Sequence, residues 1–283
     1  MCGLPLNPAG TGRGRCTGIL EADGVCRHHR QMKITTWNVN SLNVRLPHVL
    51  QYLAEEKPDV LALQETKTPD DRFPVAELEA AGYRVSFSGQ KTYNGVALLA
   101  RSAIEQVVVD LPGLDDPQRR LLAATVDGVR VIDVYIPNGE ALGSEKYAYK
   151  MRWLAALYAF LQGEIAAHDR VVLLGDFNIA PQDIDVHDPA RWQGKILCSE
   201  QERAFFASLL ELGMVDSVRS LCPDAPMFSW WDYRMSAFRR GWGIRIDHLL
   251  VAGDIRPTAA GVDVAYRNLE RPSDHAPVWI AFT

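Results

Sequence analysis

Short apolar segments recur through this chain, and six of them carry acidic, amide or imidazole side chains at or near an end. The segments are ITTWNVN with Asn38 and Asn40, VLALQE with Glu65, VIDVYIPN with Tyr135 and Asn138, VVLLGDFN with Asp176 and Asn178, RIDHLL with Asp247 and His248, and SDHAPVW with Asp274 and His275. Apolar runs of this length are typical of buried β-strands. Because strands of packed sheets bring their ends to a common rim, the pattern predicts a β-sheet protein with one polar site.

The remaining segments complete an α/β architecture. Strands are expected at residues 33–39, 59–63, 83–88, 96–100, 106–110, 121–126, 130–135, 170–174, 244–251, 259–266 and 277–282. Helices are expected at residues 44–56, 75–81, 144–168 and 199–212. Many strands with few helices, not strictly alternating, favour two packed sheets with helices on their outer faces. The expected fold is a four-layer α/β/β/α sandwich.

The bulk properties exclude few functions. The chain has 283 residues, a formal net charge of −5 and no apolar run long enough for a membrane span. Its N-terminal segment has no apolar stretch typical of a secretory signal, so we expect a cytoplasmic protein. The acidic balance does not exclude nucleic acid as a partner, because net charge does not show where the charges lie.

Several of the polar positions, taken singly, have ordinary structural explanations. Glu65 could be a solvated strand end, Asp176 a turn or helix cap, and His275 a core histidine bonded to the backbone. Asp247 is harder to explain in this way, because a carboxylate inside an apolar strand costs several kcal/mol unless it is paired. A histidine is its natural partner.

Taken together, the six segments supply the groups that phosphodiester cleavage needs. Carboxylate and amide oxygens suit a hard cation such as Mg²⁺. The reaction needs the phosphate charge neutralised, a water aimed in line and donors for the non-bridging oxygens. Cysteine and histidine clusters typical of a zinc site are absent from the body of the sequence. We therefore expect a metal-dependent phosphodiesterase.

The sequences and the order of these segments resemble the motifs of the exonuclease III family of AP endonucleases, within the wider deoxyribonuclease-I-like phosphodiesterases. The resemblance runs from Met32 to the C-terminus through WNVNS, LQETK, GYRVSFSGQKTYNGVALL, QRRLL, VYIPNG, LLGDFNIAP, FSWWDYR, GIRIDHLL and PSDHAPVW. It implies a catalytic domain over residues 32–283 built on two mixed sheets. It also implies cleavage of double-stranded DNA 5′ to abasic sites, removal of nucleotides and blocking groups from 3′ ends, and a need for Mg²⁺ or Mn²⁺.

The resemblance implies how metal and water are held. Glu65 would be the main metal ligand, with Asn38 and Asp274 completing the metal environment directly or through water. Asp176 would orient or deprotonate the attacking water. Asn178 would support that water and the phosphate.

The resemblance implies a second set of contacts, to the phosphate. His275 would bind the scissile phosphate as an imidazolium, and the buried Asp247 would keep it charged. Tyr135 and Asn138 would donate hydrogen bonds to the phosphate. Asn40, expected to contact the substrate, stands where relatives carry an acidic residue. Whether the site binds one metal ion or two therefore stays open.

Residues 228–245 read FSWWDYRMSAFRRGWGIR, in which aromatic side chains are interleaved with arginines. Such a surface suits stacking on bases and contact with phosphates, although a single tryptophan more often fills a core. The resemblance implies that Trp230 and Ile244 line the pocket for a base-less sugar. The candidates for phosphate contact are Lys91, Arg119, Arg120, Arg234, Arg239 and Arg240.

Residues 1–31 differ from the rest of the chain, with six glycines and no hydrophobic periodicity. Cys2, Cys16, Cys26 and His29 have the inventory for one tetrahedral zinc site, although their spacing is irregular. The favoured alternative is a disordered extension or a misassigned start, because the family's proteins begin at a residue corresponding to Met32.

Two other functions stay open. One is a different phosphodiesterase of the superfamily, acting on a phosphoinositide, sphingomyelin or RNA, with the same catalytic carboxylates and a changed segment 228–245. The other is a non-catalytic DNA-binding or scaffold protein on the same fold, which would need one of the catalytic positions to be missing. None is missing. We expect a monomeric enzyme.

Overall fold

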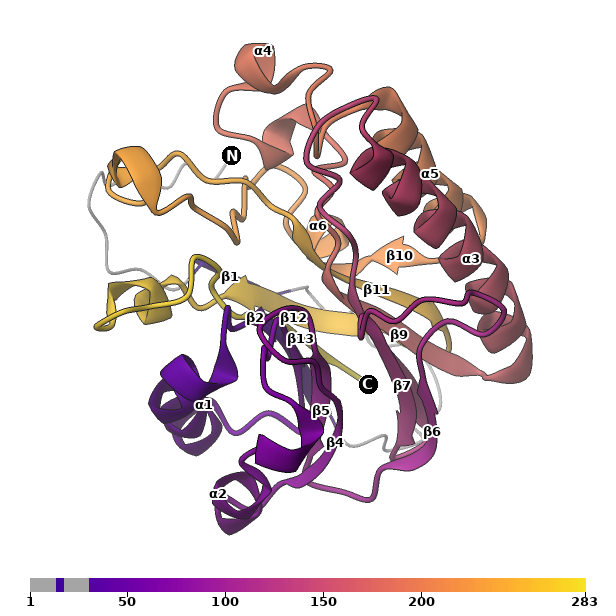
Figure 1. Ribbon diagram of the computed structural model, residues 1–283, viewed down its shortest axis with the longest axis vertical. Helices are drawn as coiled ribbons and strands as arrows, with labels where there is room; N and C mark the ends of the chain where they lie inside the picture. The colour runs from indigo at the N-terminus through magenta and orange to yellow at the C-terminus, as the bar shows by residue number, and fades with distance from the viewer. Residues whose placement is uncertain (1–13, 18–30) are drawn as a thin grey trace.

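Two β-sheets pack face to face, with helices on their outer faces (Figure 1). The computed structural model describes residues 14–17 and 31–283. The apolar residues between the two sheets form the central core, and two further cores lie between each sheet and its helices. The predicted four-layer α/β/β/α sandwich is confirmed.

The first sheet has seven strands in the order β1-β12-β13-β2-β3-β5-β4. Their bounds are β1 Gly14–Thr17, β12 Pro257–Val262, β13 Val278–Phe282, β2 Met32–Asn38, β3 Val60–Gln64, β5 Val96–Ala100 and β4 Arg84–Ser88. β2 and β3 are parallel, and β13 runs antiparallel to β2. The ends of β2 and β3 and the start of β13 therefore lie at the same edge of this mixed sheet.

The second sheet has six strands in the order β10-β11-β9-β8-β7-β6. Their bounds are β10 Val215–Asp216, β11 Asp247–Gly253, β9 Arg170–Asp176, β8 Val129–Tyr135, β7 Leu121–Val126 and β6 Glu105–Val109. β8 and β9 are parallel, and β11 is antiparallel to β9 with Asp247 opposite Asp176. This mixed sheet thus also gathers polar side chains at one edge.

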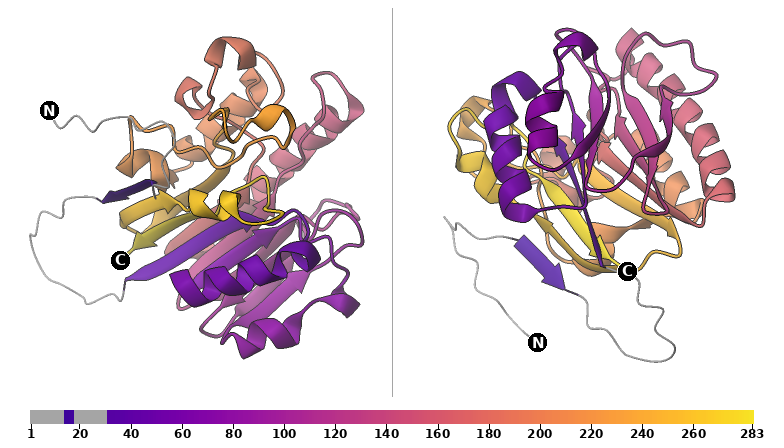
Figure 2. Two further views of the ribbon diagram at one scale, coloured as in Figure 1. Left: turned by 90° about the vertical axis from the view of Figure 1, so that its left-hand side faces the viewer. Right: turned by 90° about the horizontal axis from the view of Figure 1, so that it is seen from below.

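Helices cover both outer faces, as Figure 2 also shows. α1 (Leu42–Glu56) and α2 (Val75–Ala80) lie over the first sheet, while α3 (Glu145–Ala167) and α5 (Glu200–Glu211) lie over the second. Ser144 and Ser199 cap the starts of α3 and α5 with their side chains, as their residue type favours. The short helices α4 (Pro189–Trp192) and α6 (Ser217–Leu221) lie in connections. Within residues 31–283, no helix is long and apolar enough to span a membrane.

Two predicted strands are shorter than expected. The strand predicted at 244–251 begins only at Asp247, because Ile244 pairs in isolated bridges with Trp230 and Val186 and packs in a small separate cluster. The strand predicted at 259–266 ends at Val262, and a 3₁₀ turn follows over Val264–Asn268. Apolar residues continue through both segments, so periodicity alone did not show where the sheet ended.

Residues 14–17, the described part of the N-terminal extension, form a strand that the sequence did not predict. β1 pairs antiparallel with β12, from Gly14 opposite Val262 to Thr17 opposite Ala259. The proposed zinc ligands Cys2, Cys26 and His29, and the side chain of Cys16, lie outside the described residues. The zinc site and the division at residues 31 and 32 therefore stay predictions.

Candidate active site

The polar ends of the six segments meet at one rim of the sandwich. Asn38, at the end of β2, donates from Nδ2 to Glu65 Oε1 and to Asp176 Oδ2, at 2.9 Å in each case. It thereby joins the edge of the first sheet to that of the second. Ser273 Oγ donates to the carbonyl of Asn38 at 2.7 Å, which fixes the end of β2 to the segment that leads into β13.

A glycine allows the second sheet to place Asp176 at this rim. Gly175 has φ 138°, and a Cβ atom there would lie 1.9 Å from the carbonyl oxygen of Val134 on β8. Only glycine permits that close approach of β8 and β9. The glycine of the GDFN motif is thus required sterically, in addition to the chemical role of the aspartate that follows it.

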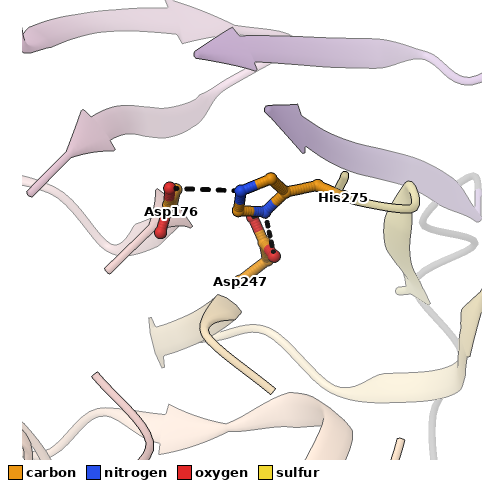
Figure 3. A group of neighbouring side chains, drawn as sticks. All are labelled: Asp176, Asp247 and His275. Carbon is orange, nitrogen blue, oxygen red and sulfur yellow. Dashed lines mark hydrogen bonds and ion pairs between the residues drawn. The ribbon is translucent and has the colours of Figure 1, made fainter. Parts of the chain in front are cut away.

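His275 lies between two carboxylates, Asp247 and Asp176 (Figure 3). Its Nδ1 is 2.8 Å from Asp247 Oδ2, and its Nε2 is 3.7 Å from Asp176 Oδ2. All three residues are buried. Ser229 Oγ donates to Asp247 Oδ2 at 2.6 Å and accepts from the backbone N–H groups of Ile246 and Asp247. The partner that buried Asp247 needs is therefore present, together with a serine that fixes its orientation.

The imidazole of His275 is charged at neutral pH. Burial alone would lower its pKa, but the nearby Asp247 and Asp176 carboxylates outweigh burial and raise the pKa to about 10. With Nδ1–H donated to Asp247, the Nε2–H is the remaining donor. Since 3.7 Å to Asp176 is too long for a hydrogen bond, that N–H is available to an anion in the rim.

Asp176 is a buried carboxyl group with a perturbed pKa. Burial raises the pKa and the His275 charge opposes this, while Asp247 and Glu65 add to the rise, giving a pKa of about 7. Besides Asn38, the backbone N–H of Asn178 donates to Asp176 Oδ1 at 2.9 Å. A carboxyl group that titrates near neutrality in a cleft suits a general base.

Glu65, just after β3, lies in a strained backbone turn and pairs with a lysine. Its backbone adopts φ 51°, in the left-handed region that a glutamate rarely occupies, and Asn40 and Asn178 nearby have φ 45° and 50°. Such strained residues cluster at functional sites. Glu65 Oε2 lies 2.8 Å from Lys67 Nζ, which also donates to Asn40 Oδ1 at 2.6 Å.

Asp274, just before β13, adds a second carboxylate near Glu65 and Asn40, from the flank of β2 opposite to β3. Its Oδ1 accepts from Asn40 Nδ2 and its Oδ2 from Trp230 Nε1, each at 3.0 Å. Burial alone would raise the pKa of Asp274, but the His275 charge and these two donors lower it below its usual value. Asp274 is therefore ionised. Glu65, Asn38 and Asp274 together offer oxygen ligands of the kind that Mg²⁺ prefers, and the surplus of negative charge at the rim fits a divalent cation.

A second grouping could hold a metal by spacing alone. Ligand atoms of Asp176, Asp247 and His275 lie within 4.8 Å of one another. However, His275 Nδ1 and Asp247 Oδ2 already bind each other at 2.8 Å, and a charged imidazole has no lone pair to offer. The Glu65 side of the rim is therefore the better cation position.

Tyr135, Asn138 and Asn178 lie on the β8 side. Asn138 Nδ2 donates to Asn178 Oδ1 at 2.9 Å. Burial, followed by the Glu65 charge, raises the pKa of Tyr135 well above its usual value, so its hydroxyl keeps its proton. These groups supply neutral donors next to Asp176.

Three neighbours of the site were not identified from the sequence. Lys150 Nζ, fully buried on α3, donates to the carbonyls of Asn138 and Asn178 at 3.3 and 2.8 Å. Ser229 and Lys67 hold Asp247 and Glu65 as described above. Lys67 stands within the quoted LQETK motif and could have been singled out there. Lys150 falls on the apolar face of α3, at helical spacing from Leu154, Leu157 and Leu161, and this position was the signal that could have found it.

The predicted substrate residues lie around the rim unevenly. Trp230 contacts Asp274 and pairs in bridges with His275 and Ile244, so both predicted pocket residues are next to the site. Arg120 places its guanidinium 4.5 Å from the centre of the Tyr135 ring. Within the described residues, none of the other predicted cations contacts the catalytic groups: Arg119 pairs with Asp110, Arg234 with Asp232, Arg240 stacks on Trp242, and Lys91 and Arg239 are exposed.

Comparison with known proteins agrees with this geometry. Residues 35–275 match the Endonuclease/Exonuclease/phosphatase family. The chain is 37% identical to exodeoxyribonuclease III of Haemophilus influenzae over 267 residues, which are 89% of this chain and 100% of that relative.

Two solved structures are also similar. One is a 3′ phosphatase from Neisseria bound to a product DNA hairpin, with 53% identity, a TM-score of 0.85 and coverage of 89% of this chain and 99% of that one. The other is an AP endonuclease from Archaeoglobus fulgidus, with 39% identity, a TM-score of 0.85 and the same coverage of both chains.

Proposed function

Since this chain belongs to the Endonuclease/Exonuclease/phosphatase family and, within it, to the exonuclease III group, we propose that it is a DNA-repair hydrolase. It cuts double-stranded DNA 5′ to abasic sites and removes nucleotides and blocking phosphates from 3′ ends. The proposed cofactor is Mg²⁺, with Mn²⁺ as a substitute, and the proposed enzyme is a monomer.

One observation supports this function most strongly. The N–H of a charged imidazole, His275 Nε2, faces Asp176 Oδ2 at 3.7 Å in a buried rim lined by Glu65 and Asn38. A donor for a phosphate oxygen and an acceptor for a water proton thus stand side by side. In-line displacement at phosphorus needs this arrangement.

In the proposed reaction, Asp176 accepts a proton from the attacking water, and the Asn178 side chain helps to hold that water. His275 Nε2–H donates to a non-bridging oxygen, and Tyr135 and Asn138 donate to the phosphate. The P–O3′ bond breaks, and the 3′ oxygen takes up a proton. A divalent cation held by Glu65, Asn38 and Asp274 would supply positive charge to the phosphate and the departing oxygen.

The substrate end of the proposal rests on Trp230 and Ile244. Trp230 is anchored to Asp274 by its indole N–H, and Ile244 pairs with it through the backbone. The partly exposed Trp230 forms a wall that suits a sugar without its base, whereas a base-paired nucleotide would need the duplex to open. Ile244 is fully buried and packs behind Trp230.

The balance between the two activities is a separate question. The relative with the higher identity is named for 3′-phosphate removal, and the other solved relative for abasic sites. We therefore propose that 3′-end removal is at least as fast as abasic incision.

The test is cleavage of a DNA duplex carrying one tetrahydrofuran abasic analogue, beside a matched duplex ending in a 3′-phosphate. Both should be cleaved in Mg²⁺ and neither after chelation with EDTA. Asp176→Asn and Glu65→Ala should abolish both reactions while leaving the fold intact. Cleavage of a phosphoinositide or of RNA, with both DNA substrates intact, would refute the proposal.

A further inference from the structure

A cavity of about 680 Å³ opens beside the candidate active site. It lies between the loops 89–95, 110–120 and 136–144 and the first turns of α3. The lining side chains that bear on its chemistry are Gln90, Asn94, Gln118, Arg120, Asn138 and Lys146. Its volume falls within the range of about 300–1,000 Å³ that is usual for small-molecule sites.

The cavity wall is a network of amides with fixed orientations. Arg120 Nε donates to Gln118 Oε1 at 2.9 Å, and the backbone N–H of Arg119 donates to Gln90 Oε1 at 3.2 Å. Asn94 Nδ2 donates to the oxygens of both glutamines, at 2.8 and 3.3 Å. Because Arg120 and the backbone N–H can only donate, each glutamine must turn its oxygen toward them.

Donors outnumber acceptors in the free capacity of the wall, whose acceptors are Asn94 Oδ1 and the Glu140 carboxylate. With their oxygens used, Gln90 and Gln118 keep their Nε2 amino groups, which make no hydrogen bond within residues 31–283. Arg120 and Lys146 add positive charge. The carboxylate among the lining side chains, Glu140, lies 3.2 Å from Lys146 Nζ. A ligand here must be rich in acceptors and negatively charged, as a nucleotide is.

The cavity continues directly into the site. Asn138 lines it and also donates to Asn178 Oδ1 at 2.9 Å. Arg120 donates to the backbone carbonyl of Tyr135 at 3.1 Å and stacks over its ring.

The cavity and the Trp230 wall lie on opposite sides of the catalytic groups. In the two sheets, β5 and β7 lie on one side of the pairs β2–β3 and β9–β8, and β13 and β11 lie on the other. The cavity belongs to the first side. Trp230, bridged to Ile244 and His275, belongs to the second.

We propose that this cavity binds the nucleotide immediately 5′ to the scissile phosphate, the one whose 3′ oxygen departs. The inference rests on the proposed function, in which the sugar 3′ to that phosphate lies against Trp230. A strand that crosses the rim with its phosphate beside His275 then carries its 5′ neighbour to the opposite side. The amide and guanidinium donors there match the phosphate and base acceptors of that nucleotide.

The proposal predicts that both kinds of substrate place a nucleotide in this cavity. An abasic strand and a strand ending in a 3′-phosphate both have a nucleotide 5′ to the bond that breaks. A 3′-phosphate has no sugar on the other side. A variant of the cavity should therefore weaken both reactions.

The test uses Gln118→Glu and Gln90→Glu, which keep the size of the side chain and an oxygen acceptor but replace the free donor with negative charge. Lys146→Ala is a second variant, and its side chain is 70% exposed, so folding should not depend on it. Gln162→Glu is the matched control, with the same charge change about 20 Å along α3 from Tyr149. Steady-state kinetics are measured on the tetrahydrofuran duplex and on the 3′-phosphate duplex.

The expected result is a rise in KM of about tenfold on both duplexes for each glutamate variant, with kcat nearly unchanged. Lys146→Ala should raise both KM values by a smaller factor, and Gln162→Glu should match the unmodified protein. Unchanged KM values for all cavity variants would overturn the inference and leave the proposed function standing. A loss on the tetrahydrofuran duplex alone would overturn it too, since the cavity would then lie on the 3′ side. Inactivity of the unmodified protein on both duplexes would refute the proposed function itself.

Discussion

His275 carries its charge in a place where burial disfavours it, and Asp247 is the largest reason that it can. A histidine with a pKa raised from 6.5 to about 10 stabilises the folded state fully below pH 6.5, and this stabilisation is lost as the pH rises toward 10. The same charge is what would meet the phosphate. Stability and catalysis therefore depend on one ion pair.

We predict that Asp247→Asn lowers kcat by about 10²–10⁴-fold at pH 7.5. Without the carboxylate, burial should bring the His275 pKa below its present value, so the loss should deepen with rising pH and shrink near pH 6. A pH–rate profile of the variant beside the unmodified protein tests this. A parallel pair of profiles would contradict it, because His275 would then not depend on Asp247 for its charge.

Another buried acid, Asp133, lies between the two sheets. Asp133 Oδ1 accepts from Gln64 Nε2 at 2.6 Å, while Asp133 Oδ2 and Gln64 Oε1 have no partner in the part of the chain that is described. Burial raises the pKa of Asp133 well above 3.8, and the bond from Gln64 opposes this only in part. Its contribution to stability is thus fully present below pH 3.8 and is lost as the pH rises through the raised pKa.

Asp133→Asn should therefore stabilise the protein at pH 8, by about 1–3 kcal/mol, because an amide is neutral and can donate to Gln64 Oε1. The gain should shrink toward pH 4. Urea unfolding at several pH values measures it, with the exposed Asp224→Asn as the control. Equal stability of Asp133→Asn and the unmodified protein at pH 8 would show that burial of Asp133 does not cost folding free energy at that pH.

At the scale of elements, one buried ion pair joins two helices and two loops of the site. Lys150 on α3 lies 2.5 Å from Glu202 on α5, and neither side chain is exposed. Glu202 also accepts from the backbone N–H groups of Leu197 and Ser199. The carbonyls of Asn138 and Asn178 complete the bonds of Lys150.

Lys150→Met should lower the free energy of unfolding by about 3–5 kcal/mol, because it leaves the Glu202 carboxylate buried without a counter-charge. Adding Glu202→Gln should recover part of this loss. Lys146→Met, one turn earlier on α3 and exposed, is the control and should change stability little. Full stability of Lys150→Met would mean that Glu202 is neutral or solvated.

Most of the strands around the site were predictable because each is an apolar run with a polar end. The run fixes burial, and the polar end marks the rim. β10, α4 and α6 were missed, since elements of two to five residues carry too little periodicity to recognise. The partners of Lys150 were not predictable either, because they come from three other segments that only the fold brings together.

At the scale of the whole molecule, an acidic protein must present its cations where DNA lies. The net charge is −5, yet Arg120, Lys146 and Lys67 border the site and its cavity. The number of strands and their sequences allowed the sandwich to be predicted. The positions of the surface cations were not predictable, because surface charges follow no periodic pattern.

We predict that KM for duplex DNA rises by about tenfold or more between 50 and 200 mM NaCl, since phosphate contacts release counterions. Hydrolysis of bis-p-nitrophenyl phosphate, which makes no extended contact, should change little over the same range. A flat salt dependence for the duplex would argue against phosphate contact by these side chains.

The central claim is that a divalent cation on the Glu65 side and the imidazolium of His275 hold one phosphate between them. The most direct measurement is anomalous scattering from Mn²⁺ in a crystal of Asp176→Asn bound to a duplex with one tetrahydrofuran. We predict a Mn²⁺ peak within bonding distance of Glu65, and the phosphate 5′ to the tetrahydrofuran within hydrogen-bond distance of His275 Nε2. A peak bound instead by Asp247 and His275, or a phosphate away from His275, would contradict the account.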